Sequence, residues 1–348
     1  MKQIQYKDFS LKTHKKKWKL KRLNVCQFEI TFRCGLHCKH CYADCYNKSE
    51  YIKKELKMKD VKSILDKVYE AGVIWICFTG GDPLIREDFL DIYYYAKAKG
   101  FIITIFTSAY SMTKEIANYL RKNPPFVIEM TINGVTKDVY EKISQVKDSF
   151  DKVIDGLGLI LKANLPLKIK TQVTKDNLSQ LPMIKKYIEG LGLKFRPDYN
   201  LYACLNGDLS PCNLRISPSQ LLSLNGRVKT ACISEFSKLN EHNDSFFRCA
   251  IDSEDEINLD PYGNMFLCNL IRQPAFNLLQ VDIGYATNRL LSMAKGNKFA
   301  IDSKCNGCNL RELCLWCPGK ALLETGDIGK HIEYYCELTQ LTKKRFVV

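Results

Sequence analysis

Residues 25–42 read VCQFEITFRCGLHCKHCY, a β-rich run from Val25 to Thr31 that leads into a loop with three cysteines. Five further β-rich runs follow before residue 200 and alternate with helical patterns. Strands are expected at 74–79, 101–107, 127–131, 167–173 and 193–196, and helices at 59–71, 88–99, 114–121, 150–163 and 179–191. This alternation is typical of a parallel α/β sheet. Periodicity does not choose between a partial barrel and an open doubly wound sheet, but both place chemistry at the carboxyl ends of the strands.

The composition is that of a globular protein: 46% of the 348 residues are hydrophobic and 26% are charged, which excludes collagen-like and largely disordered chains. No apolar run is long enough to cross a bilayer, and the basic N-terminus lacks the apolar core of a signal peptide. We therefore expect a cytoplasmic protein with no membrane partner. Its 16 cysteines indicate metal ligands or redox groups, because a reducing compartment keeps structural disulfides open.

The first cysteine group is Cys34, Cys38 and Cys41, spaced C-x3-C-x2-C in the loop after the first strand. Three thiolates suit a [4Fe–4S] cluster with one open iron, whereas a structural zinc site closes with four ligands. A zinc knuckle completed by His37 or His40 is the alternative. Two other cysteines, Cys26 and Cys77, fall within predicted strands and are expected to be core thiols, and Cys45 is unassigned.

The second expected strand ends in Gly80-Gly81-Asp82. Glycines let a backbone approach a ligand closely, and a carboxylate accepts hydrogen bonds from an ammonium group. Together with the cysteine loop, this motif resembles the radical SAM enzymes, in which Glu usually stands where this chain has Asp82. The resemblance implies a partial (β/α)6 barrel and S-adenosylmethionine (SAM) bound at the open iron. It also implies reductive cleavage of SAM to methionine and a 5′-deoxyadenosyl radical that abstracts hydrogen.

The same resemblance implies further SAM contacts at the strand ends. Tyr42 would lie against adenine, and polar side chains would contact the ribose and methionyl groups: Thr107, Ser108, Thr131, Asn133 and Gln172. The arginine that commonly holds the SAM carboxylate has no counterpart at 140–147, so that contact is unassigned. No residue is assigned as a catalytic general base.

The second cysteine group comprises Cys249, Cys268, Cys305, Cys308, Cys314, Cys317 and Cys336. Seven sulfurs imply two metal centres, with zinc ribbons as the alternative to iron–sulfur clusters. The pattern resembles the SPASM extension of radical SAM enzymes, although its last pair is C-x2-C instead of C-x3-C. The resemblance implies two auxiliary [4Fe–4S] clusters: an outer one on Cys305, Cys308, Cys314 and Cys336, and an inner one on Cys249, Cys268 and Cys317. The inner cluster is completed by Cys232, Cys212 or Cys204, or is open to water or substrate.

These patterns divide the chain into four segments: a basic N-terminal arm at 1–22, a radical SAM partial barrel at 23–200, a bridging region at 201–248 and a SPASM-like auxiliary cluster domain at 249–348. The bridging region is expected to contain a helix at 218–225, and the last domain a helix at 336–345. A hairpin turn at 260–263 would present Cys268.

Most members of the SPASM group modify peptides or protein side chains, so the resemblance implies maturation of a ribosomally synthesised peptide through a thioether or carbon–carbon crosslink. A ferredoxin or flavodoxin would supply electrons. The basic stretch 12–22 is either a solvated arm or a surface for an acidic leader peptide, and a separate leader-recognition protein is a candidate partner. Alternatives are a sulfatase-type protein maturase, a tetrapyrrole-modifying enzyme and, distantly, a zinc-dependent nucleic-acid-binding protein, which the even spread of basic residues disfavours.

Overall fold

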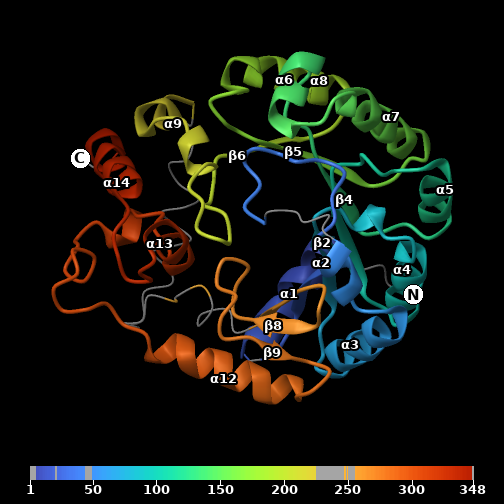
Figure 1. Cartoon of the computed structure of the whole chain (residues 1–348), viewed down its shortest axis with the longest axis horizontal. Helices are drawn as coiled ribbons and strands as arrows, with labels where there is room; N and C mark the ends of the chain where they lie inside the picture. Colours follow the sequence, from blue (N-terminus) through green and yellow to red (C-terminus); the bar gives the residue numbers. More distant parts are fainter. Residues whose placement is uncertain are drawn as a thin grey trace.

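The computed structural model describes residues 5–19, 22–43, 49–224, 247, 249 and 255–346. Its first half is built on six parallel strands: β1 Val25–Thr31, β2 Trp75–Gly80, β3 Ile102–Thr107, β4 Val127–Thr131, β5 Leu167–Gln172 and β6 Phe195–Asp198. Each strand pairs with its predecessor along the chain, so the strand order never reverses. A doubly wound sheet requires such a reversal. The six units therefore form the predicted partial barrel, with the helices on its outer side (Figure 1).

The helices of this half are α2 Ser49–Lys54, α3 Met58–Glu70, α4 Phe89–Ala98, α5 Lys114–Lys122, α6 Lys137–Ser144, α7 Ser149–Lys162 and α8 Leu181–Gly190. In α3, the apolar positions Val61, Ile64, Leu65 and Val68 recur at helical spacing and are buried. They join strand residues such as Phe28 and Ile128 in one continuous core. The six predicted strands and five predicted helices are confirmed, with no end displaced by more than two residues.

The sheet continues beyond the six parallel units. Strand β7, Glu256–Leu259, pairs parallel with β1, and the antiparallel strands β8, Asn264–Phe266, and β9, Phe276–Asn277, follow. The predicted turn is confirmed: Gly263 has φ 86°, and Asp260 Oδ1 accepts hydrogen bonds from the backbone N–H of Tyr262 and Asn264, both at 2.9 Å. Residues 256–277 thus extend the barrel sheet, although they were predicted to belong to the auxiliary cluster domain.

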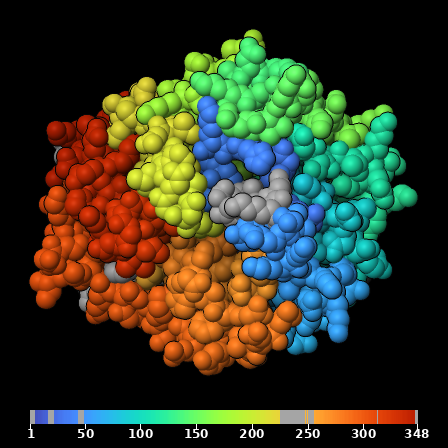
Figure 2. Space-filling model, in the orientation of Figure 1, coloured from blue at the N-terminus to red at the C-terminus, as the bar shows by residue number. Residues whose placement is uncertain are grey.

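The C-terminal helices are α9 Pro218–Leu224, α12 Ile283–Gly296, α13 Pro318–Thr325 and α14 Glu333–Phe346. Short 3-10 helices occur in both halves of the chain, at Pro83–Ile85, Leu178–Gln180, Cys212–Leu214 and Arg311–Leu313. The predicted last helix therefore begins three residues earlier, at Glu333. The orange-to-red segments fill the open side of the blue-to-green crescent (Figures 1 and 2). Two small apolar clusters hold them, one where α9 meets α14 and one around Phe247 and Phe299. Residues 225–246 of the bridging region lie outside the described residues.

The predicted basic N-terminal arm contains a helix, α1 Tyr6–Lys19. Trp75 Nε1 donates a 3.0 Å hydrogen bond to the Tyr6 hydroxyl, and the His14 ring stacks on Trp75 at 4.7 Å between centroids. Because Trp75 begins β2, α1 lies at the amino ends of the strands, away from the carboxyl ends where the cysteine loop lies. Among the described residues, no helix has both the length and the apolar character needed to span a bilayer.

Candidate functional site

The first cysteine loop leaves the carboxyl end of β1 and docks on α6. The backbone N–H of His37 donates to Ser144 O at 2.9 Å, and that of Lys39 donates to Ile143 O at 3.0 Å. Burial raises the pKa of the Cys38 thiol, and the nearby Cys41 and Cys34 thiols raise it further. The structure therefore gathers the three predicted ligands into one electrostatically coupled group.

The residues around the three thiols help to distinguish a zinc site from a [4Fe–4S] cluster. His37 is exposed, whereas burial lowers the pKa of His40 to about 4, and its Nδ1 has no hydrogen-bond partner among the described residues. Within the described part of the chain, no group of three or more His, Cys, Asp and Glu side chains is placed to hold a single metal ion. Three thiols in one loop are a donor set that fits a [4Fe–4S] cluster with an open iron.

The glycine pair after β2 fixes this loop. A Cβ atom at Gly80 would lie 2.0 Å from Thr31 O, and one at Gly81 would lie 2.1 Å from Arg33 O. The Gly81 N–H donates to Thr31 O at 2.9 Å, and the Asp82 N–H donates to Arg33 O at 2.8 Å. The backbone of the glycine pair thus packs closely against the start of the cysteine loop. This contact leaves no room for a side chain at either glycine.

Asp82 connects two of the predicted contact segments. Its carboxylate is fully buried and accepts hydrogen bonds from the Thr107 hydroxyl at 2.8 and 2.9 Å, the Ser108 hydroxyl at 2.6 Å and the Ser108 N–H at 3.1 Å. The Leu84 N–H also donates to it, at 3.1 Å. Burial raises its pKa, and these hydrogen bonds oppose that rise. Both carboxylate oxygens are engaged by the chain itself, so an ammonium group would have to share them. Asp82 ties the end of β2 to the end of β3.

The remaining predicted contacts lie at the ends of β4 and β5. Asn133 Oδ1 accepts a 2.9 Å hydrogen bond from the Gln172 N–H. The Gln172 side chain donates to Asp198 O at 3.0 Å and to Asn200 O at 2.8 Å. Thr131, which is half-buried, stands opposite Lys170 in the register of β4 and β5. These residues come together as predicted, but the described hydrogen bonds of Asn133 and Gln172 are to backbone groups.

Lys170 is a candidate site residue that the sequence analysis missed. Its Nζ lies 4.6 Å from the Phe106 ring centroid, and its charge contributes to the lowered pKa of His40. The lysine therefore lies between the ends of the strands and the cysteine loop. The sequence feature that could have identified Lys170 is the alternation of side chains along β5, which puts Lys170 on the same face as Gln172.

The C-terminal cysteines influence one another within two groups. Burial raises the pKa of Cys305 to about 11, with further contributions from Cys336, Cys314 and Cys308. Burial likewise raises the pKa of Cys268 to about 12, with contributions from Cys317 and Cys249. A cavity of about 420 Å³ is lined by six of these seven cysteines: Cys249, Cys305, Cys308, Cys314, Cys317 and Cys336.

Two of the three cysteines considered for completing the inner set lie elsewhere. Cys204 Sγ is 3.5 Å from Cys41 O, next to the first cysteine loop, and Cys212 is electrostatically coupled to Cys204. The third, Cys232, lies outside the described residues, as does Cys45. Of the two expected core thiols, Cys26 is buried in the main core as predicted, whereas Cys77 is half-buried and contacts Phe78 O at 3.9 Å.

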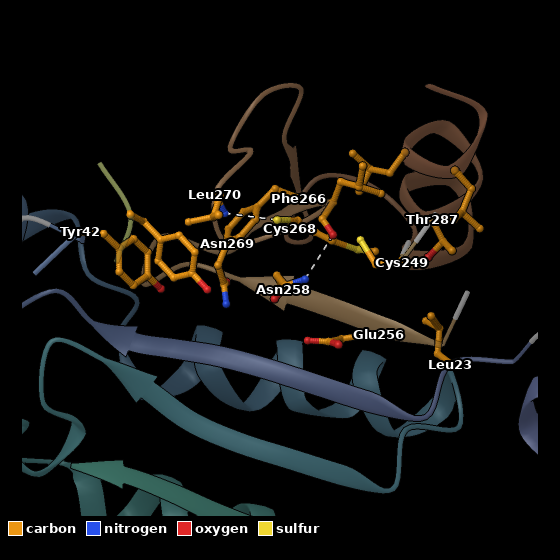
Figure 3. Close-up of a pocket in the computed structure, with 15 residues that line it drawn as sticks. Leu23, Tyr42, Cys249, Glu256, Asn258, Phe266, Cys268, Asn269, Leu270 and Thr287 are labelled. Carbon is orange, nitrogen blue, oxygen red and sulfur yellow. Dashed lines mark hydrogen bonds between the residues drawn. The ribbon is translucent and has the colours of Figure 1, made fainter. Parts of the chain in front are cut away.

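A second cavity, of about 310 Å³, lies between the first loop and the inner set (Figure 3). Tyr42 lies at one end of it, edge-to-face with Tyr202 at 5.7 Å between centroids, and burial raises the pKa of Tyr42. Cys268 and Cys249 border the same cavity, with Asn269 between them and Tyr42 in the view of Figure 3. The tyrosine predicted to contact adenine thus also faces the inner cysteines.

Two buried ion pairs attach the C-terminal segments to the barrel side. Arg272, four residues after Cys268, binds Glu29 of β1 with two hydrogen bonds of 2.6 and 2.9 Å. Arg215 binds Glu324 of α13 at 2.8 and 2.7 Å. Glu29 is only 2% exposed, and burial raises its pKa although Arg272 opposes the rise. Paired, hydrogen-bonded charges of this kind fix the relative position of the elements that carry them.

Comparisons with known proteins agree with this geometry. Residues 28–181 match the model of the Radical SAM superfamily. Similar curated proteins include the AdoMet-dependent heme synthase of Oleidesulfovibrio alaskensis, 30% identical over 165 residues (47% of this chain, 42% of that protein), and the PqqA peptide cyclase of Bradyrhizobium diazoefficiens, 28% identical over 158 residues (45% and 40%). The aligned part spans less than half of each relative.

Among solved structures, Streptococcus suis SuiB bound to its precursor peptide SuiA is similar in fold over nearly the whole chain. The TM-score is 0.70 at 15% sequence identity, covering 94% of this chain and 79% of that one. Residues 28–181, which include the cysteine loop and the strand ends described above, therefore form a radical SAM domain.

Proposed function

We propose that this protein is a radical SAM enzyme that cleaves SAM reductively at a [4Fe–4S] cluster held by Cys34, Cys38 and Cys41 and abstracts hydrogen from a peptide. The observation that carries the proposal is that these three cysteines lie in one loop at the carboxyl end of β1, docked on α6, within the residues that match the Radical SAM superfamily. When bound there, the cluster supplies the electron that cleaves SAM.

The residues around the cysteine loop hold the loop in place and are positioned to bind and orient SAM. The hydrogen bonds of Gly81 and Asp82 hold the ends of β2 and β3 against the cysteine loop, so the loop is fixed before any ligand arrives. Lys170 is a suitable partner for the SAM carboxylate, because its ammonium group lies beside the loop at the strand ends. Tyr42 lies where the loop meets the cavity that leads to the C-terminal cysteines, so it can help to orient a ligand there.

Two auxiliary [4Fe–4S] clusters are part of the proposal. The two coupled sets of thiols and the cavity among them support an outer cluster on Cys305, Cys308, Cys314 and Cys336 and an inner cluster on Cys249, Cys268 and Cys317. The Cys204 sulfur contacts Cys41 O, and the thiols of Cys204 and Cys212 influence each other. The fourth inner position is then taken by Cys232, or it is open to water or substrate.

A peptide substrate is supported by the names of the relatives, which include a peptide cyclase, and by the SuiB structure with its bound precursor peptide. We therefore propose maturation of a ribosomally synthesised peptide, with a small electron-transfer protein as donor and a leader-recognition protein as partner. The cavity from Tyr42 to Cys268 is the proposed space for the reacting side chain. The identity to a heme synthase favours a tetrapyrrole precursor as the second candidate substrate.

The test uses the full chain, reconstituted anaerobically with iron and sulfide and then mixed with dithionite and SAM. Chromatography of 5′-deoxyadenosine reports SAM cleavage, and mass spectrometry reports modification of a short peptide encoded by a neighbouring gene. We expect the triple variant C34A/C38A/C41A to form no 5′-deoxyadenosine, and C314A to form it without modifying peptide. Cleavage that survives the triple change contradicts the proposal.

A further inference from the structure

Lys320 is a buried lysine that the proposed reaction does not use. It is the third residue of α13, directly after Cys317-Pro318-Gly319, and it is 6% exposed. Its backbone N–H lies 3.4 Å from Cys317 Sγ. Its Nζ donates hydrogen bonds to Leu315 O at 2.9 Å and to Asn200 Oδ1 at 3.3 Å. The ammonium group is therefore fixed in position beside the inner cysteines.

Aromatic faces complete the surroundings of this ammonium group. Nζ lies 4.3 Å from the Tyr335 ring centroid and 5.6 Å from that of Tyr202, and both rings attract a cation through their negative faces. These neutral partners orient the charge but do not balance it. A buried charge costs free energy unless an opposite charge accompanies it.

The nearby carboxylate of Glu324 already forms an ion pair with Arg215, because both Nη atoms of Arg215 donate hydrogen bonds to it. Burial lowers the pKa of Lys320, and the Arg215 charge adds to this lowering. Cys317 opposes it most strongly, followed by Glu324 and then Cys314. Cys317 belongs to the proposed inner set and Cys314 to the proposed outer set. One fixed cation thus faces thiolates of both proposed clusters, within the cavity that the two sets line.

We propose that Lys320 balances the charge of the two auxiliary clusters and raises their reduction potentials, the inner one more than the outer. This inference rests on the proposed function, since it requires the clusters. Reduction adds one electron to a cluster and moves no atoms or protons, so it adds one negative charge near Lys320. A buried cation stabilises that added charge with little screening by water.

The experiment is an anaerobic redox titration of the reconstituted full chain with dithionite, followed by electron paramagnetic resonance of the auxiliary clusters. Iron and sulfide content are measured on every variant to verify loading. In K320M we expect the inner cluster to be at least tenfold harder to reduce, which is about 59 mV for one electron, with a smaller shift at the outer cluster. K320R retains the charge, and its potentials are expected close to those of the unchanged protein.

Lys304 provides the matched control, because it lines the same cavity but its side chain is 70% exposed and pairs with Glu333 at 3.6 Å. Water and salt screen such a charge, so K304M should shift the potentials much less than K320M. If K320M fails to load, K320Q, which retains a donor without the charge, is compared with K320R instead. Unchanged potentials in a loaded K320M or K320Q overturn the inference. A wild-type chain without auxiliary iron contradicts the proposed function instead.

Discussion

The two halves of the chain position their cysteines by different means. In the barrel, Cys34, Cys38 and Cys41 follow a buried strand, and backbone hydrogen bonds and two glycines fix their loop against its neighbours. In the C-terminal half, the cysteines lie on several kinds of element: Cys268 follows β8, Cys336 lies in α14, and four others lie in loops before α13. Small apolar clusters and buried ion pairs hold the surrounding segments. Backbone contacts therefore position the first group, whereas side-chain contacts hold the segments that carry the second.

The largest expected effect comes from breaking the ion pair between Glu29 of β1 and Arg272, which follows β8. R272M leaves the Glu29 carboxylate buried without its partner, which typically costs about 3–5 kcal/mol of unfolding free energy. Burial already raises the pKa of Glu29, and Arg272 opposes that rise. Without Arg272 the pKa rises further. The penalty is therefore full above the folded pKa of Glu29 and shrinks as pH falls through it, because the protonated carboxyl tolerates burial.

Anaerobic urea unfolding at pH 7 and pH 5 measures this difference between R272M and the unchanged protein. The double variant E29Q/R272M removes both charges and should recover part of the lost stability. Equal stability of R272M and the unchanged protein at pH 7 would show that the pair does not stabilise the fold.

A smaller loss of stability is expected when a methyl group is added at Gly81, between the end of β2 and the cysteine loop. In G81A the new Cβ would meet Arg33 O at 2.1 Å, so the loop must shift, at a cost of about 1–3 kcal/mol. We expect lost stability and reduced 5′-deoxyadenosine formation. The control is G158A on α7, where no atom lies within 4 Å of the new Cβ and where alanine favours the helix by about 0.5–1 kcal/mol. G81A that loads iron and cleaves SAM normally would disprove backbone fixation of the loop.

The smallest effect concerns ligand binding inside the barrel. K170M removes the cation beside the cysteine loop and should weaken SAM binding by about tenfold, the loss of one charge-assisted hydrogen bond. The matched control is K168M, two residues earlier on β5, because Lys168 is 58% exposed and lies 4.0 Å from Glu129. Isothermal titration of SAM into the reconstituted variants measures both. The same affinity in K170M and K168M would leave the carboxylate contact unassigned.

Local sequence patterns predicted the barrel half well. Its strands are short apolar runs, and helices such as α3 show a regular buried stripe, so neighbouring residues alone determine both. The grouping of the C-terminal cysteines came from the resemblance to the SPASM extension, and the electrostatic neighbours of Cys305 and Cys268 are compatible with it.

Features that depend on distant contacts were not predicted. Helix α1 is polar, and it rests on Trp75 through Tyr6 and His14, a contact that its own sequence does not reveal. The packing of the glycine pair against the backbone at Thr31 and Arg33 was not predicted, because those residues lie about 50 positions earlier in the chain. Burial of Lys320 depends on Asn200 and Tyr335, on either side of it along the chain. Such packing partners cannot be inferred from periodicity.

We propose that one radical SAM enzyme uses both groups of cysteines, the one in the barrel loop and the one in the C-terminal half. The most direct test is the iron and sulfide content of the anaerobically reconstituted full chain, measured together with 5′-deoxyadenosine formed from dithionite and SAM. We expect three [4Fe–4S] clusters, hence about twelve irons per chain, and formation of 5′-deoxyadenosine. Bound zinc without SAM cleavage would contradict this proposal.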